Sequence, residues 1–228
     1  KRNSMKEHPP YPWVDWSIDN FTGIEIWNHM SEWMEGLTEA NKYNYFVHPL
    51  KSISSPPEET LKVWDELNQS RKVVGIGGID AHAHKINVLG FFEVEVFPYK
   101  ILFKSIRTHI LIENKLVSGE SNANLENAKI EIYGALKEGR CFVSNYYHGD
   151  ASGFRFFAES DNQIYQMGDY VPLNKSVKLK TLLPNISATI RLIKNGEIID
   201  SIDNFDAEFN VTSSGAYRVE IFINQNAW

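Results

Sequence analysis

Apolar and polar residues alternate with two different periods along this chain, and the period changes near residue 141. Before that point, short apolar runs suited to strands are separated by segments with apolar residues three or four positions apart, which suit helices. We predict strands over 21–28 and 72–79 and helices over 31–37, 56–67 and 122–137. Strands that alternate with helices are typical of a parallel α/β sheet or barrel.

Two of the predicted helices carry recognisable terminal signals. The helix over 56–67 has prolines before or at its first turn and acidic residues beside them, and both features favour a helix N-terminus. Its apolar residues Leu61, Trp64 and Leu67 share one face. The helix over 122–137 is followed by Gly139, which is a suitable C-cap because glycine tolerates positive φ.

From residue 141 onward the period is two. Several short segments alternate apolar with polar residues, and Asn195-Gly196 between two of them is typical of a type I′ hairpin turn. These strands predict a small antiparallel β-sandwich of the immunoglobulin-like kind. We therefore expect two domains, an α/β part over residues 1–143 and the sandwich over residues 144–228.

Composition excludes several kinds of partner. The 228 residues include 29 acidic and 23 basic ones without a basic stripe, so binding to nucleic acid is not expected. The apolar runs are too short to span a membrane, so no membrane partner is expected. Cys141 is the single cysteine, which excludes a disulfide within the chain and favours a reducing compartment. A cytoplasmic location is the resulting expectation.

The segment Gly75-Ile-Gly-Gly-Ile-Asp80-Ala-His82-Ala-His84 carries the clearest chemical signal. In an extended chain, side chains two positions apart point the same way, so one carboxylate and two imidazoles would share a face at the end of a buried strand. Such groups are partial ligand sets for a divalent metal. The simpler alternative is an exposed loop that binds nothing. A dinucleotide-binding loop is rejected because Asp80 takes the place of its third glycine.

These residues resemble motifs of the PHP (polymerase and histidinol phosphatase) superfamily of metal-dependent phosphoesterases. The likeness is carried by Asp19–Asn28, by His48-Pro49 with residues 56–67, by Val73–His82 and by Ala135–Arg140. The order and spacing match the C-terminal half of a distorted seven-stranded β/α barrel with an appended β-sandwich. The resemblance implies hydrolysis of a small phosphate ester by metal-activated water, with Asp80 and His82 as catalytic residues and metal ligands.

The chain departs from the superfamily in one large respect. Members begin with a His-x-His pair and add further ligands from later strands, and none of these early motifs occurs here. The resemblance therefore implies that the divalent ions (Zn, Mn or Fe) bind weakly or not at all, that the chain alone is catalytically silent, and that a truncated barrel self-associates. Substrate and bond type, phosphate ester or another ester or amide, stay open.

Other residues near the motif are candidates for lesser roles. His48, placed where a strand is expected to end, and Asn28, at the end of the 21–28 strand, are candidate substrate-binding residues. Glu25 lies within that apolar strand, where an acid is costly unless paired, and is expected to contact a metal ligand rather than the metal. His84 is expected at the rim of the site. The aromatic residues near the N-terminus, around Trp13, Trp16, Trp27 and Trp33, are expected to pack in the core rather than bind a sugar or a base.

A non-catalytic function is the alternative. The sandwich would then be a binding or docking module for a carbohydrate or a partner domain, as suggested by Tyr146, Tyr147 and Tyr165. A contiguous exposed aromatic patch would favour this hypothesis, whereas packed rings would indicate a structural domain.

Overall fold

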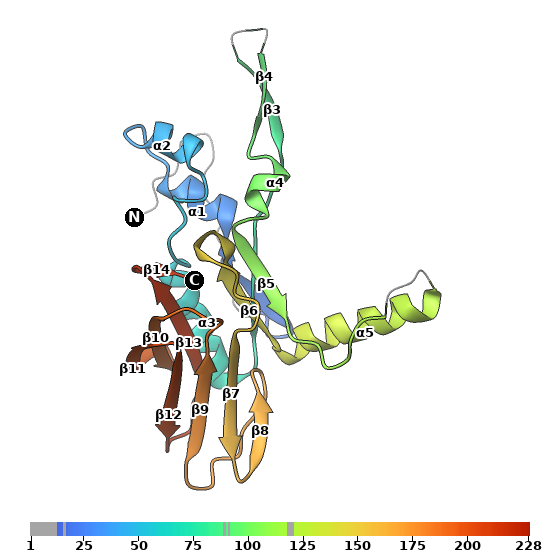
Figure 1. Cartoon of the computed structure of the whole chain (residues 1–228), viewed down its shortest axis with the longest axis vertical. Coiled ribbons are helices and arrows are strands. Elements are labelled where there is room, and N and C mark those ends of the chain that lie inside the picture. Colours follow the sequence, from blue (N-terminus) through green and yellow to red (C-terminus); the bar gives the residue numbers. More distant parts are fainter. Residues whose placement is uncertain (1–12, 16, 89, 91, 118–120) are drawn as a thin grey trace.

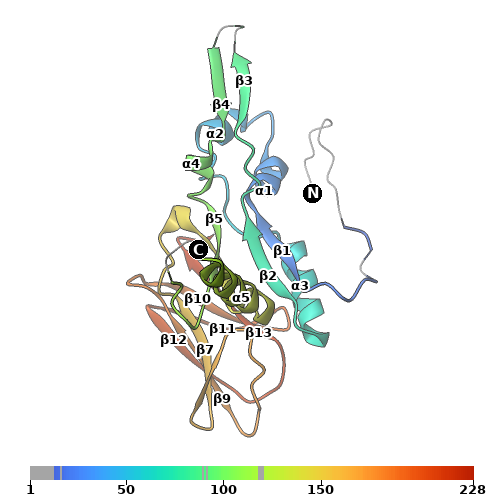
Figure 2. The same ribbon diagram turned by 90° about the vertical axis from the view of Figure 1, so that its right-hand side faces the viewer.

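Two parallel strands and the helices between them in sequence form the centre of the first half of the chain (Figures 1 and 2). The computed structural model describes residues 13–15, 17–88, 90, 92–117 and 121–228. Strand β1 (Gly23–Asn28) pairs with β2 (Val74–Gly78), and between them lie α1 (His29–Gly36), α2 (Lys42–Val47) and α3 (Glu58–Ser70).

Helix α3 packs on one face of this strand pair through Trp64. A side chain at Gly75 would come within 2.9 Å of the Trp64 indole, so the glycine makes room for the ring. The Trp64 indole nitrogen donates to the Val73 carbonyl at 2.7 Å, which connects the helix to the start of β2. Helix α3 therefore contacts the strand pair through Trp64, a residue of its predicted apolar face.

A hairpin that sequence reasoning did not predict follows β2. Strands β3 (His84–Val88) and β4 (Phe92–Val96) pair in antiparallel register, His84 opposite Val96, and Gly90 in the turn has φ +79°. Figures 1 and 2 show this hairpin projecting from the body of the molecule. The short helix α4 (Tyr99–Leu102) returns the chain to the body.

A second antiparallel pair lies beside β2. Strands β5 (Ile106–Ile110) and β6 (Cys141–Asn145) are separated in sequence by α5 (Asn122–Glu138), and η1 (Tyr146–His148) follows β6. The Thr108 hydroxyl accepts from the Gly77 N–H at 2.9 Å and donates to the Gly77 carbonyl at 2.8 Å. Strands β2 and β5 are therefore joined by hydrogen bonds from a β5 side chain to the β2 backbone, in place of backbone-to-backbone hydrogen bonds.

The last third of the chain forms two four-stranded antiparallel sheets. Buried residues of both sheets, among them Leu179 and Phe209 on one and Ile190 and Ile221 on the other, belong to one apolar cluster, so the sheets pack face to face. The strand orders are β12-β9-β7-β8 and β11-β10-β13-β14. The strands are β7 (Arg155–Ser160), β8 (Gln163–Gln166), β9 (Val177–Leu182), β10 (Ala188–Lys194), β11 (Glu197–Asn204), β12 (Asp206–Val211), β13 (Tyr217–Ile223) and β14 (Asn226–Ala227).

The sandwich and the first half of the chain share contacts through the C-terminal strands. A second apolar cluster unites Trp27, Trp33 and Ile53 with Ala227 of β14. The Ala227 N–H donates to the Ser54 carbonyl at 2.8 Å, and Arg218 of β13 forms an ion pair with Asp65 of α3. The end of the chain thus packs into the core of the first half.

The predicted PHP barrel is wrong for this structure. The described residues contain more strand than helix, and β1–β2 is the one parallel pair among their five sheets. A β/α barrel needs successive parallel strands that are each followed by a helix. Here a hairpin follows β2 and an antiparallel strand pair follows the hairpin, so no closed barrel forms in the described part of the chain. None of the described helices combines the length and apolarity needed to cross a membrane.

Candidate functional site

Asp80 and His82 lie together just beyond the carboxyl end of β2. His82 Nε2 is 3.5 Å from Asp80 Oδ1, and each side chain is 55% exposed. The His82 ring also stacks on the His84 ring, with centroids 5.2 Å apart and planes inclined by 21°. The three side chains expected on one face are therefore neighbours, and they form an open surface site.

The backbone brings them together in a different way from the one predicted. Strand β2 ends at Gly78, and Asp80 and Ala83 have φ values of +48° and +50°. The chain is therefore turned rather than extended between β2 and β3. The prediction that side chains two positions apart point the same way does not hold in this segment. Aspartate tolerates the left-handed region better than most residues, which suits Asp80 to this bend.

Glu25 and Asn28 on the neighbouring strand β1 approach the same end of the sheet, because Asn28 is paired with Gly78. Asn28 Nδ2 donates to Glu25 Oε2 at 3.0 Å. Burial raises the pKa of Glu25, the hydrogen bond from Asn28 lowers it in part, and the negative charge of Asp80 raises it further.

His48 lies on a helix end and not on the expected strand end. Residues 42–47 form α2, and the His48 N–H caps it by donating to the Asn44 carbonyl at 2.8 Å. The strand expectation was wrong because the run Tyr45-Phe-Val packs as helix, with the Phe46 ring 5.9 Å from that of Phe97. Among the described residues no hydrogen bond, ion pair or ring contact joins His48 to the other candidates.

The donor set at this site fits part of a metal centre. The described residues contain no group of three or more His, Cys, Asp or Glu side chains arranged to hold a metal ion. A carboxylate and an imidazole are ligands that Zn²⁺ and Mn²⁺ both accept, but structural and catalytic zinc sites use at least three protein ligands. Asp80 and His82 can therefore serve as two of the ligands of a larger set.

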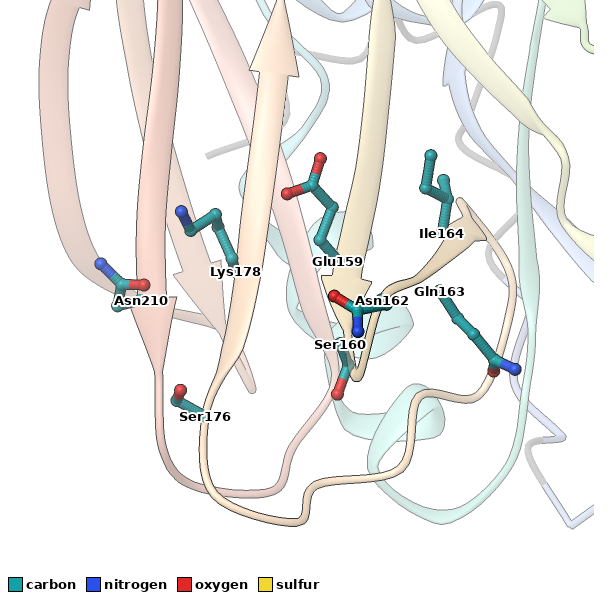
Figure 3. Close-up of a pocket in the computed structure, with 8 residues that line it drawn as sticks. All are labelled: Glu159, Ser160, Asn162, Gln163, Ile164, Ser176, Lys178 and Asn210. Atoms are coloured by element: carbon teal, nitrogen blue, oxygen red, sulfur yellow. The ribbon is translucent and has the colours of Figure 1, made fainter.

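A separate depression of about 460 Å³ lies on the β12-β9-β7-β8 sheet of the sandwich (Figure 3). Its charged groups are already paired, because Lys178 contacts Glu208 at 2.7 Å and Glu159 contacts Lys180 at 2.9 Å. The depression has no aromatic lining. The lining residues are Glu159, Ser160, Asn162, Gln163, Ile164, Ser176, Lys178 and Asn210.

The tyrosines that suggested a docking module have different environments. Arg107 covers the Tyr146 ring, with its guanidinium carbon 3.4 Å from the centroid. Tyr165 packs against the sandwich core and its hydroxyl donates to Gln163 at 2.8 Å. Tyr147 is the exposed member of the three, at 44%. Two of the three rings therefore act in packing. Trp27 and Trp33 are 2% and 4% exposed, which confirms their predicted place in the core. The same prediction is wrong for Trp13, which is 59% exposed, and Trp16 lies outside the described residues.

Sequence reasoning missed a buried histidine that directly follows Asn28. His29, the first residue of α1, is fully buried, and neither ring nitrogen has a hydrogen-bond partner among the described residues. Burial lowers the pKa of His29 to about 4. Its sequence signal was weak, because a histidine that follows a strand is ordinarily exposed.

His29 is expected to make stability fall as the pH is lowered. The unfolded chain takes up a proton on this ring near pH 6.5, whereas the native state does so only near pH 4, so acid favours unfolding within that window. The loss between about pH 7 and about pH 5 is expected to be roughly 2 kcal/mol. Urea unfolding at both pH values measures it.

The control is His29→Leu, which replaces the imidazole by an apolar side chain of similar size and so removes the titrating group. Burial raises the pKa of Glu32, which acts in the opposite direction, so the informative quantity is the difference between wild type and variant. The same pH dependence in His29→Leu would show that another group is responsible.

Comparison of the chain with protein-family models, with curated proteins and with solved structures returns no match. The resemblance of the sequence motifs to the PHP superfamily therefore stays a prediction.

Proposed function

We propose that Asp80 and His82 are two ligands of a divalent-metal centre in a hydrolase that acts on phosphate esters. The observation that supports this proposal most is their meeting at 3.5 Å immediately beyond the carboxyl end of a parallel strand. The carboxyl ends of parallel strands are where catalytic groups gather in α/β enzymes. The motif around the two residues resembles that of metal-dependent phosphoesterases.

Each group has a distinct task in this proposal. The Asp80 carboxylate and the His82 imidazole hold the cation, which when bound lowers the pKa of water and polarises a phosphoryl oxygen. Asn28 orients Glu25 on the neighbouring strand β1. At least one more protein ligand is needed besides these two.

Replacing either ligand is expected to weaken metal binding. Titration of the 228-residue chain with Mn²⁺ and with Zn²⁺ in a calorimeter should show weak binding, and Asp80→Asn or His82→Asn should raise the dissociation constant at least about tenfold. Glu95→Gln is the matched control, because it removes one negative charge from an exposed position on β4. Any Mn²⁺-dependent hydrolysis of p-nitrophenyl phosphate should disappear in Asp80→Asn. Equal Mn²⁺ affinities of wild type and Asp80→Asn would contradict the proposal.

A further inference from the structure

Helix α4 and the residues that follow it carry exposed aromatic rings beside positive charges, at the base of the projecting hairpin (Figures 1 and 2). The Tyr99 and Phe103 rings stack with centroids 6.0 Å apart, and they are 49% and 58% exposed. Lys100 and Lys104 are exposed next to them, and neither forms an ion pair with a carboxylate of the described residues. No acidic residue occurs from position 96 to position 112. These four side chains, the cationic face, are therefore locally positive in a chain with a net charge of -6.

Strand β11 carries the opposite combination on the sandwich. It is the outer strand of the β11-β10-β13-β14 sheet, so one of its two edges has no neighbouring strand in that sheet. Ile198 and Ile199 are exposed on this strand, and Phe205 is exposed directly after it. No lysine or arginine occurs from position 195 to position 217. The exposed acidic residues of this surface, the acidic strand, are Glu197, Asp200, Asp203 and Asp206.

The two surfaces complement each other in charge and in exposed apolar side chains. Apolar side chains on a surface with charges of one sign are typical of a site that binds an oppositely charged macromolecule. One copy cannot bring its own two surfaces together, because α4 lies at the base of the hairpin and β11 lies in the sandwich, apart from α4 in both views (Figures 1 and 2). Two β11 strands would not pair with each other, because their carboxylates would meet, and charged residues on an edge strand oppose such pairing.

We propose that the cationic face of one copy of this chain binds the acidic strand of a second copy. The aromatic rings cover the exposed isoleucines, and the two lysines face the carboxylates of β11. The contact is heterologous, because each copy uses a different surface, so it builds a closed ring or an open chain of copies. It involves neither Asp80 nor His82 and is independent of the proposed metal site.

Mixing of charge-reversed variants tests this contact. Wild-type protein is expected to associate in sedimentation velocity at about 20 mM NaCl and to dissociate at about 500 mM NaCl, since salt screens exposed charges. The double variants Lys100→Glu/Lys104→Glu and Asp200→Lys/Asp203→Lys should each raise the dissociation constant at least about tenfold, because each then has charges of one sign on both surfaces. An equimolar mixture of the two double variants should associate again, because each meets surfaces of opposite charge on the other.

Lys62→Glu/Lys175→Glu is the matched control, because it reverses two exposed lysines that lie outside both surfaces and changes the net charge by the same amount. It should associate like wild type. Phe103→Ser keeps the charge and removes one exposed ring, so it should also weaken association. Circular dichroism checks that each variant is folded.

Three results would overturn the inference. The first is a wild-type protein that stays monomeric at about 20 mM NaCl. The second is association of Lys100→Glu/Lys104→Glu that equals that of the control, and the third is a mixture of the reversed variants that stays monomeric. If monomeric wild type instead binds phosphatidylserine vesicles and Lys100→Glu/Lys104→Glu does not, the cationic face serves an anionic lipid surface and the contact between copies is wrong.

Discussion

Replacing Arg218 by alanine is expected to destabilise the protein by about 3 to 5 kcal/mol, because it removes one partner of a buried ion pair. Arg218 Nε and Nη2 donate to the two carboxylate oxygens of Asp65 at 2.6 and 2.8 Å, and Nη1 donates to Glu220 at 2.5 Å. The Asp65 and Arg218 side chains are 10% and 17% exposed. Without Arg218, the carboxylate of Asp65 stays buried between α3 and β13 without its counter-charge.

The pKa of Arg218 has two opposing influences. Burial lowers it, but hydrogen bonds from the guanidinium to Asp65 and Glu220 more than offset that effect and raise the pKa above its ordinary value. The guanidinium therefore stays charged in the junction between the sandwich and the first half. Its environment stabilises the charge only while both carboxylates are present.

Urea unfolding of Arg218→Ala, Asp65→Ala and the double variant measures this effect as a double-mutant cycle. The double variant should lose less than the sum of the two single losses, because neither charge is then left alone. Arg155→Ala is the control, since Arg155 is an exposed arginine of β7 that donates to Gln166. A loss in Arg218→Ala no larger than in Arg155→Ala would contradict the prediction.

Gly168→Ala is expected to cost about 2 to 4 kcal/mol, because backbone conformation and contact both oppose a side chain there. Gly168 has φ +88°, and an added Cβ would overlap the carbonyl oxygen of Glu138 at the end of α5. A Cβ built on the neighbouring Gly139 would lie 3.4 Å from the Cα of Gly168, so the two glycines are also within contact range. Two backbones meet here, and neither can move away as a flexible side chain would.

The control for this variant is Gly134→Ala in the middle of α5. A side chain at Gly134 meets nothing within 4 Å, so the substitution should stabilise the helix by about 0.5 to 1 kcal/mol. Thermal and urea unfolding of both variants give the comparison. If Gly168→Ala is as stable as wild type, the close approach of the β8–β9 connection to α5 is wrong.

Local features of the fold were readable from the sequence where a residue type decides its own conformation. Gly139 caps α5 with φ +75°, as predicted, since glycine accepts that angle without cost. Asn195 and Gly196 have φ +52° and +90° in the turn between β10 and β11, which confirms the predicted hairpin turn. Period-two alternation after residue 153 likewise identified strands that form antiparallel sheets.

The barrel prediction failed because strand and helix patterns do not say how strands pair. Residues 84–96 alternate as Lys-Ile-Asn-Val and Phe-Glu-Val-Glu-Val, and this pattern was overlooked beside the more prominent metal motif. Strand β5 was not predicted either. Its pairing with β6 and the bridge from Thr108 to Gly77 are long-range contacts without a signal in local periodicity.

The candidate site was predictable in part. Asp80 and His82 are two positions apart, so their proximity at 3.5 Å follows from the local chain. The place of Glu25 depends on Gly78, some fifty positions later, and on the amide of Asn28. Asp65 lies on a helix whose spacing identified only its apolar residues, and its partner Arg218 comes from the opposite end of the chain.

The sequence by itself determined the Asn195-Gly196 turn, the Gly139 cap, the burial of Trp27 and Trp33 and the pair of residues proposed to bind metal, because these depend on the conformational limits and hydrophobicity of nearby residues. Only the tertiary structure decided the strand pairing, the buried His29, the Asp65–Arg218 junction and the approach of Glu25 to Gly78. These features depend on which distant segments share a surface. The free energy gained by burying apolar side chains and by pairing buried charges arises only when those segments come into contact.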